Sequence, residues 1–180
     1  MLQKILSLLI ALTLLFSATA LAATEKYTLE EDFQQFDVEV EIPEGAQYKQ
    51  NPKDGWLSLE IWFEDPAKPS FDLNISFSEE VEGGFLADFS QEDKDHLVAL
   101  ISEDFSVPVH EFFETPSGNT VLLTRETDTE AGDYALMVTV YKGFFFSLYC
   151  SHQDYSPLAE EDLALMHQII EGTWITDTEK

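Results

Sequence analysis

Hydrophobic and polar side chains alternate along three segments in the first half of the chain. The segments are FDVEVEI (36–42), WLSLEIWFE (56–64) and FDLNISF (71–77). Because successive side chains of a β-strand point to opposite faces, alternation with period two predicts strands that have one buried and one solvated face. The residues expected to face inward are Phe36, Val38, Val40 and Ile42 in the first segment, Leu57, Leu59, Ile61 and Phe63 in the second, and Phe71, Leu73, Ile75 and Phe77 in the third. We therefore expect these strands to form an antiparallel sheet with one wet face.

Two later segments carry the signals of helices. In SQEDKDHLVALISEDF (90–105), Ser90 is a suitable N-cap and acidic residues fill the first turn. The apolar stripe expected for this helix consists of Leu97, Leu100, Ile101 and Phe105. In SPLAEEDLALMHQIIEG (156–172), Ser156 is the expected cap, Pro157 lies in the first turn and Gly172 ends the helix. The apolar face expected here consists of Ala159, Leu163, Met166 and Ile170.

Four further segments predict strands, namely VHEFFE (109–114), NTVLLTRE (119–126), YALMVTVY (134–141) and FFFSLYCS (144–151). If Lys142 and Gly143 form a two-residue turn, the last two segments pair as a hairpin. The expected pairs are Tyr141 with Phe144, Thr139 with Phe146, Met137 with Leu148, and Ala135 with Cys150. Both faces of this hairpin are mostly apolar, so it needs a covering layer on each side and belongs near the centre of the sheet.

Cys150 is the one cysteine of the chain and lies in this apolar setting. It cannot form an internal disulfide, and a buried thiol behaves as a small apolar side chain. A catalytic thiolate requires a basic, partly exposed environment, whereas the expected neighbours of Cys150 are aromatic and aliphatic and the nearest base in the sequence is His152. We interpret Cys150 as a packing residue, with an intermolecular disulfide and then a catalytic role as the alternatives.

The first 22 residues have the layout of a secretory signal peptide. A lysine precedes an apolar run (5–16), and Ala20 and Ala22 occupy the positions of an A-x-A cleavage site. The apolar run is shorter than the roughly 20 residues that a membrane span needs. We therefore expect cleavage before Ala23, no stable membrane anchor afterwards, and a protein that is secreted or held in the periplasm or cell envelope. Retention of the segment as an anchor is the alternative.

The mature residues 23–180 suit one α+β domain, and no linker or repeat divides them. We predict a central antiparallel sheet of about six to seven strands with helices packed on its faces. The order of the elements, the IPEGAQY turn (42–48) and the end of the last helix, MHQIIEGTWI (166–175), resemble the PsbP-like fold. That fold is shared by extrinsic photosystem proteins, a nuclear import factor and small bacterial exported proteins such as the DcrB-like group. The resemblance implies an accessory or binding role through protein contacts, and it supplies no site residue.

The chain is strongly acidic, with 35 acidic and 9 basic residues and a net charge of −26, which becomes −27 when Lys4 is removed with the signal peptide. Such a surface repels the phosphates of nucleic acids and anionic lipids, so neither is an expected partner. Solubility and self-repulsion explain the charge more simply than a dedicated site for a cation or a basic partner.

The sequence contains no motif for a metal, a cofactor or catalysis. His110–Glu111 and His152–Asp154 lack the spacing of a zinc site. DTEAGD (128–133) lacks the final glutamate of an EF-hand loop and is expected to be a turn. There is no G-x-S-x-G elbow and no glycine-rich phosphate loop. We therefore predict no metal site, no cofactor and no catalytic residue.

The second amphipathic segment places two tryptophans, Trp56 and Trp62, on its solvated face. Such a face is either covered by a helix or the N-terminal segment, or it forms an aromatic platform for a sugar or a partner protein. Glu60 lies between the tryptophans, and Asp72 and Asn74 on the neighbouring strand can supply a polar rim. These five residues are the candidate ligand-binding site.

Two hypotheses for the function follow from these observations. The first is an exported, monomeric binding or accessory protein of unknown ligand, with a protein or carbohydrate partner and without catalysis. The alternative is a secreted hydrolase that acts on envelope polysaccharide through paired carboxylates. The hydrolase needs two acids that face one pocket, whereas the binding protein needs an exposed Trp56/Trp62 surface without such a pair.

Overall fold

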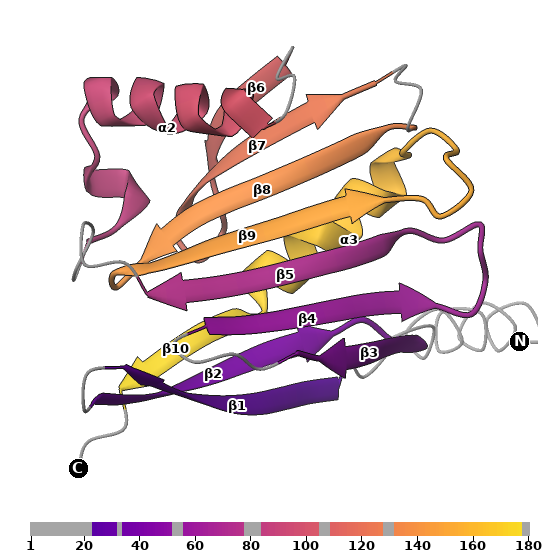
Figure 1. Cartoon of the computed structure of the whole chain (residues 1–180), viewed down its shortest axis with the longest axis horizontal. Coiled ribbons are helices and arrows are strands. Elements are labelled where there is room, and N and C mark those ends of the chain that lie inside the picture. The colour runs from indigo at the N-terminus through magenta and orange to yellow at the C-terminus, as the bar shows by residue number, and fades with distance from the viewer. Residues whose placement is uncertain are drawn as a thin grey trace, which may run out of the picture.

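The computed structural model describes residues 23–31, 34–51, 56–77, 84–104, 109–127 and 132–177 (Figure 1). In chain order the elements are β1 (Ala23–Glu31), β2 (Gln34–Ile42), β3 (Ala46–Gln50), β4 (Trp56–Phe63), β5 (Ser70–Phe77), the 3-10 helix η2 (Leu86–Asp88), α2 (Gln91–Asp104), β6 (Val109–Glu114), β7 (Thr120–Glu126), β8 (Tyr134–Tyr141), β9 (Phe144–Ser151), α3 (Glu160–Glu171) and β10 (Thr173–Asp177). The segment predicted to be a signal peptide lies outside the described residues. In the described part of the chain, no helix is long and apolar enough to cross a membrane.

The larger of two sheets has seven strands in the order β3-β4-β5-β9-β8-β7-β6. Every neighbouring pair in it is antiparallel. The prediction of an α+β fold built on a central antiparallel sheet is therefore confirmed. The pairing of β5 with β9 joins the two halves of the chain, since Phe71 lies opposite Cys150 and Leu73 lies opposite Leu148.

The hairpin of β8 and β9 has the predicted register, with Met137 opposite Leu148 and Ala135 opposite Cys150. Lys142 and Gly143 have φ angles of 53° and 83°. Positive φ at both central residues is what a type I′ turn requires, and such turns follow the twist of the flanking strands. Both strands lie inside the large sheet, as their two apolar faces demand.

The prediction that the first amphipathic segment joins the same sheet as the next two is wrong. β2 is the middle strand of a second sheet with the order β1-β2-β10. Its apolar residues, Phe36, Val38, Val40 and Ile42, are buried in the core that this sheet shares with the large one. Alternation fixes which side chains face inward but does not choose the strand partners, and here the apolar face of β2 is buried by packing of sheet on sheet. The sequence pattern also does not predict β1, β3 and β10.

The start of α2 is confirmed. Ser90 Oγ accepts a hydrogen bond from the Asp93 backbone N–H at 3.2 Å, and the Asp93 carboxylate accepts one from the Ser90 N–H at 3.1 Å. This reciprocal pair is a capping box. Leu97 is buried and Ile101 packs beside it, whereas Leu100 is 48% exposed and does not belong to the predicted stripe. Phe105 lies outside the described residues.

The last helix, α3, begins later than predicted, with Ala159 at the N-cap position instead of Ser156. The Asp162 carboxylate accepts a hydrogen bond from the Ala159 N–H at 2.7 Å, which is the contact that the N3 residue of a capping box makes with the N-cap backbone. The predicted apolar face is otherwise confirmed, because Leu163, Met166 and Ile170 are buried, while Ala159 is exposed.

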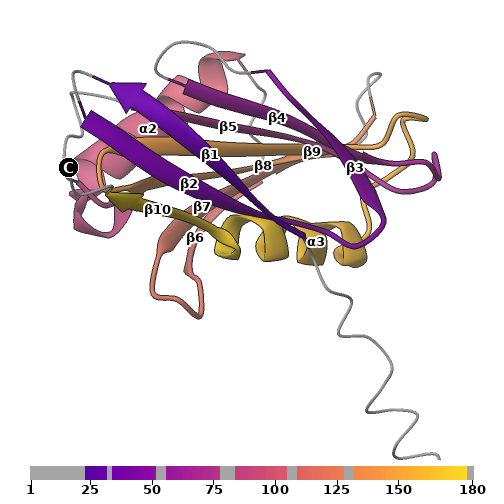
Figure 2. The same ribbon diagram turned by 90° about the horizontal axis from the view of Figure 1, so that it is seen from below.

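The two helices cover opposite faces of the large sheet (Figure 2). α3 and the three-stranded sheet pack on the inner face and enclose the main core. On the outer face, η2 and α2 cover β7 and β8 through a smaller apolar cluster of Leu86, Leu97, Leu122, Leu136, Val138 and Val140. The described elements leave the outer face of β4 and β5 uncovered, and this open half of the sheet carries the candidate site.

Candidate functional site

A groove of about 490 Å³ lies on the outer sheet face where the cover by α2 ends. Its lining comes from β4, β5, β8, β9 and α2 and consists of Ser58, Glu60, Asp72, Asn74, Ile101, Leu136, Val138, Phe145, Ser147 and Tyr149. The strand register explains its polar floor, because Ser58 lies opposite Asn74, which in turn lies opposite Ser147. The other side is apolar, and α2 contributes Ile101 to it. The volume falls within the range of roughly 300–1,000 Å³ that small-molecule sites occupy.

A second hollow of about 280 Å³ continues along the same face toward the end of β4. It is lined by Glu60, Ile61, Trp62, Ser70, Phe71, Asp72 and Gln153. Glu60 and Asp72 belong to both spaces and are direct cross-strand partners. The two carboxylates therefore stand between the groove and the hollow.

The five residues predicted as a ligand site all lie on this outer face. Glu60, Asp72 and Asn74 line the groove, and Trp62 lines the second hollow together with the two acids. Trp56 lies near the other end of β4, opposite Ser76, and lines neither space. Both tryptophans are half-buried, so neither offers a freely exposed ring.

The paired acids give the groove a local negative charge. Cβ atoms of direct cross-strand partners lie about 5 Å apart, and like charges in such positions repel. The pKa of Asp72 is raised, first because neighbouring groups displace water from its carboxylate and second because Glu60 is negatively charged. Asn51 Nδ2 donates a hydrogen bond of 2.9 Å to Glu60 Oε1 and so restrains that carboxylate. Among the described residues that line the two spaces, none is basic.

Tyr149 forms an aromatic part of the groove wall. Its ring stacks on Tyr134, with ring centroids 5.6 Å apart and 28° between the planes. The Tyr134 hydroxyl donates a hydrogen bond to the Glu126 carboxylate, so the stacked pair is tied to β7. Burial raises the pKa of Tyr149, and the negative charge of Asp72 contributes in the same direction.

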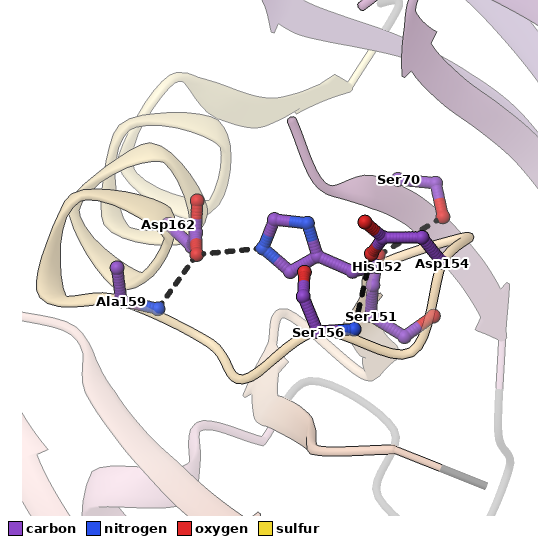
Figure 3. A network of polar contacts seen from close by, with 7 residues as sticks. All are labelled: Ser70, Ser151, His152, Asp154, Ser156, Ala159 and Asp162. Carbon is purple, nitrogen blue, oxygen red and sulfur yellow. Dashed lines mark hydrogen bonds and ion pairs between the residues drawn. The ribbon is translucent and has the colours of Figure 1, made fainter. Parts of the chain in front are cut away.

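A network of polar contacts anchors the loop between β9 and α3, which brings Gln153 to the second hollow (Figure 3). His152 and Asp162 are 6% and 7% exposed, and His152 Nε2 lies 2.9 Å from Asp162 Oδ2. The same carboxylate oxygen accepts the Ala159 N–H. An ionised carboxylate can only accept hydrogen bonds, so the tautomer of His152 that satisfies Asp162 carries its proton on Nε2. Farther along the loop, the Asp154 carboxylate accepts the Ser156 N–H at 3.0 Å, and hydrogen bonds from Ser156 lower the pKa of Asp154. Figure 3 thus shows how β9 and the start of α3 fix the loop.

Cys150 is fully buried beneath this loop, in the inner core, and it is a free thiol. Burial raises its pKa, and the negative charge of Asp162 adds to the effect. A thiolate is therefore disfavoured at this position. The prediction that Cys150 is a packing residue is confirmed.

The sequence analysis missed the part of the groove that comes from the second half of the chain. Ser147 and Tyr149 were assigned to a mostly apolar hairpin face that needs cover, and α2 provides this cover over β8 but leaves β9 partly open. Ser147 and Tyr149 reach the groove because β9 pairs with β5, which lies far from it in the sequence. Asn74 lies opposite Ser147, and Asp72 lies opposite Tyr149. No short motif encodes such a contact. Gln153 carries no sequence signal either.

The two histidine–acid pairs that were considered in the sequence, and that lack the spacing of a zinc site, do not belong to a metal-binding cluster among the described residues. His110 and Glu111 are both exposed neighbours on β6, and His152 contacts Asp162. Across the described ranges, no three His, Cys, Asp or Glu side chains are arranged to hold a metal ion. Of the calcium-like segment, residues 128–131 lie outside the described residues.

Comparisons with known proteins add no function to this geometry. No family model matches the chain, and a search of curated proteins found no similar sequence.

Proposed function

We propose that the chain is an exported binding protein that takes a ligand in the groove on the open half of its large sheet and does not change that ligand chemically. The observation that carries the proposal is the lining of the groove. A polar row of Ser58, Asn74 and Ser147 faces an apolar wall that includes Ile101 and Phe145. Binding sites typically combine an apolar surface for affinity with a few polar groups for orientation.

The finer assignment of the fold, a PsbP-like domain of the DcrB-like type, belongs to the same proposal. It is supported by the layout, with an antiparallel sheet between helices on opposite faces. Export is supported by the composition of residues 1–22. The intact mass of protein recovered from the medium or envelope tests it, and we expect the mass of a chain that starts at Ala23.

A secreted hydrolase is the second candidate, and one observation favours it. Glu60 and Asp72 face the same groove, which is the arrangement that the hydrolase hypothesis requires. Both residues are nevertheless exposed, although neighbouring groups displace part of the water around the Asp72 carboxylate. Catalysis by charge stabilisation depends on a site that excludes water, so these open carboxylates support binding better than hydrolysis. The exposed Trp56/Trp62 surface expected of a binding protein is half-buried, so the groove lining and not the tryptophans supports the binding proposal.

Ligand mapping by NMR tests the binding proposal. Amide shifts of the isotope-labelled mature chain are recorded with small panels of envelope oligosaccharides, amines and peptides. We expect a binding compound to shift the amides around Asn74 and Ser147, and we expect Ser147→Trp, which fills the groove, to abolish the shifts. Glu161→Trp is the matched control, because Glu161 is exposed on α3, and α3 packs on the opposite sheet face.

The two candidates give different results in this experiment. Release of new reducing ends from a soluble polysaccharide, lost in Glu60→Gln, would establish the hydrolase and overturn the proposal. Shifts that cluster away from the groove, or that survive Ser147→Trp, would also contradict it.

A further inference from the structure

The two spaces on the outer sheet face form one path that the Glu60/Asp72 pair interrupts. The larger groove lies on one side of the pair and the smaller hollow on the other, and both acids line both spaces. A ligand seated in the groove therefore meets two carboxylates at its end. The class of ligand that this end of the groove recognises rests on the proposed function, because the ligand occupies the same groove.

The charge of the pair has no counterpart in the lining. None of the described lining residues is a lysine or an arginine. Glu60 receives one neutral hydrogen bond, from Asn51, and Asp72 stands directly opposite it. On its other side Glu60 lies opposite Lys49 of β3, an exposed residue that does not line the groove. This lysine offsets part of the charge of Glu60, but the two opposed carboxylates still repel each other and raise the free energy of the folded chain. A positively charged group placed between them would remove this repulsion and gain hydrogen bonds to both.

The remainder of the groove favours hydrocarbon. Ile101, Val138 and Phe145 supply apolar side chains, and Tyr149 supplies an aromatic ring beside Asp72. The face of an aromatic ring attracts cations, and the apolar side chains gain free energy when a hydrocarbon chain displaces water from them. The lining thus combines an anionic end with an apolar body.

We propose that the groove binds an aliphatic amine, with its ammonium group between Glu60 and Asp72 and its hydrocarbon chain along Ile101, Val138 and Phe145. The groove volume of about 490 Å³ suits a free small molecule. The carboxylates recognise the charge, and the polar row of Ser58 and Asn74 borders the ammonium end.

Hexylamine and 1-hexanol are the probes, because they share a hydrocarbon chain and differ in charge. Binding to the mature chain is measured from NMR shifts and by calorimetry at fixed ionic strength. Since each exposed ion pair contributes up to about 1 kcal/mol, we expect hexylamine to bind roughly five- to thirtyfold more tightly than hexanol. Glu60→Gln combined with Asp72→Asn should remove this preference. The double variant should remain folded, because it removes a repulsion, and circular dichroism checks this.

The matched control is Glu44→Gln combined with Glu161→Gln, which changes the net charge equally at two exposed positions outside the groove. It should keep the preference for the amine. Equal losses in both double variants, or equal affinity for hexanol, would show non-specific attraction to an acidic surface and overturn the inference. If neutral oligosaccharides shift the groove amides and hexylamine does not, the amine is wrong and the binding groove stands. If no compound shifts them, the proposed function fails as well.

Discussion

Gly172, where α3 passes into β10, should not tolerate even one added methyl group. A Cβ atom at this position would lie 2.4 Å from Glu41 Cβ and 2.7 Å from Glu41 Oε2. Carbon atoms in good contact are about 3.5–4.0 Å apart, so the overlap exceeds 1 Å. Glu41 Cβ is fixed to the backbone of β2, and a change of rotamer cannot move it. The backbone at Gly172 has φ −84° and ψ 8°, which alanine can adopt, so the expected damage in Gly172→Ala is purely steric.

The magnitude follows from three contributions. Overpacking costs about 1–3 kcal/mol. If β2 moved away from the end of α3 to relieve the overlap, the hydrogen bond of 3.1 Å from the Glu41 N–H to the Gly172 carbonyl would stretch. Loss of that bond costs about 0.5–1.5 kcal/mol. Replacement of glycine by alanine restricts the unfolded chain and returns about 0.4–1 kcal/mol. We expect Gly172→Ala to lower the free energy of unfolding by about 0.5–4 kcal/mol.

Urea unfolding followed by tryptophan fluorescence measures the effect, and two second-site variants test its cause. Glu41→Gly removes the clashing Cβ, so in the Gly172→Ala background it should recover part of the lost stability. Glu41→Ala also shortens the side chain but keeps Cβ, and it should recover less. A Gly172→Ala protein within about 0.5 kcal/mol of the wild type, which is the range of ordinary surface substitutions, would refute the reasoning. Equal rescue by both second-site variants would refute it too.

Three further predictions concern the groove and its supports. Asp72→Asn should raise the thermal midpoint at neutral pH. The pKa of Asp72 is raised in the folded state, so the protonated Asp72 stabilises the fold below the ordinary value of 3.8, and this contribution is lost as the pH rises through the folded-state pKa. The gain in thermal midpoint from Asp72→Asn should therefore vanish in acid. A gain that does not depend on pH would contradict this sign. Asp162→Ala should cost about 2–4 kcal/mol in urea unfolding, because it leaves the buried His152 and the partly buried Ala159 N–H without their hydrogen-bond partner; a cost below about 0.5 kcal/mol would exclude this role. Cys150 should react with a thiol reagent at the rate of global unfolding, and rapid labelling of the native protein would show that the thiol is accessible.

Local rules predicted α2, α3 and most of the described strands, but they did not predict β1, β3 and β10, and they predicted the long-range pairings poorly. The hairpin at Lys142–Gly143 was predictable because turn chemistry and two apolar faces act within a few residues and agree. The prediction that β2 joins the large sheet failed because the alternation of apolar and polar residues is the same for a strand within that sheet and for a strand of a second sheet packed against it. Ser156 was the expected N-cap of α3, but the helix begins at Glu160, after Ala159. In this arrangement the Asp162 carboxylate accepts the Ala159 N–H and contacts the buried His152. Tertiary contacts therefore decided the partners of β2 and accompany the start of α3, whereas local chemistry decided the hairpin.

The groove illustrates why site prediction from this composition reaches only part of the way. With 35 acidic residues in the chain, a pair of carboxylates carries almost no information in sequence, and Glu60 and Asp72 were singled out only because tryptophans flank Glu60 and Asp72 lies on the next strand. The structure places the two acids opposite each other at the junction of two spaces. A pairing that opposes local stability is expected where a protein meets a ligand, because the repulsion can be relieved on binding. The repulsion at Asp72 and the affinity for a cation therefore have one physical origin, so substitutions that stabilise the free protein here should weaken the binding of an amine.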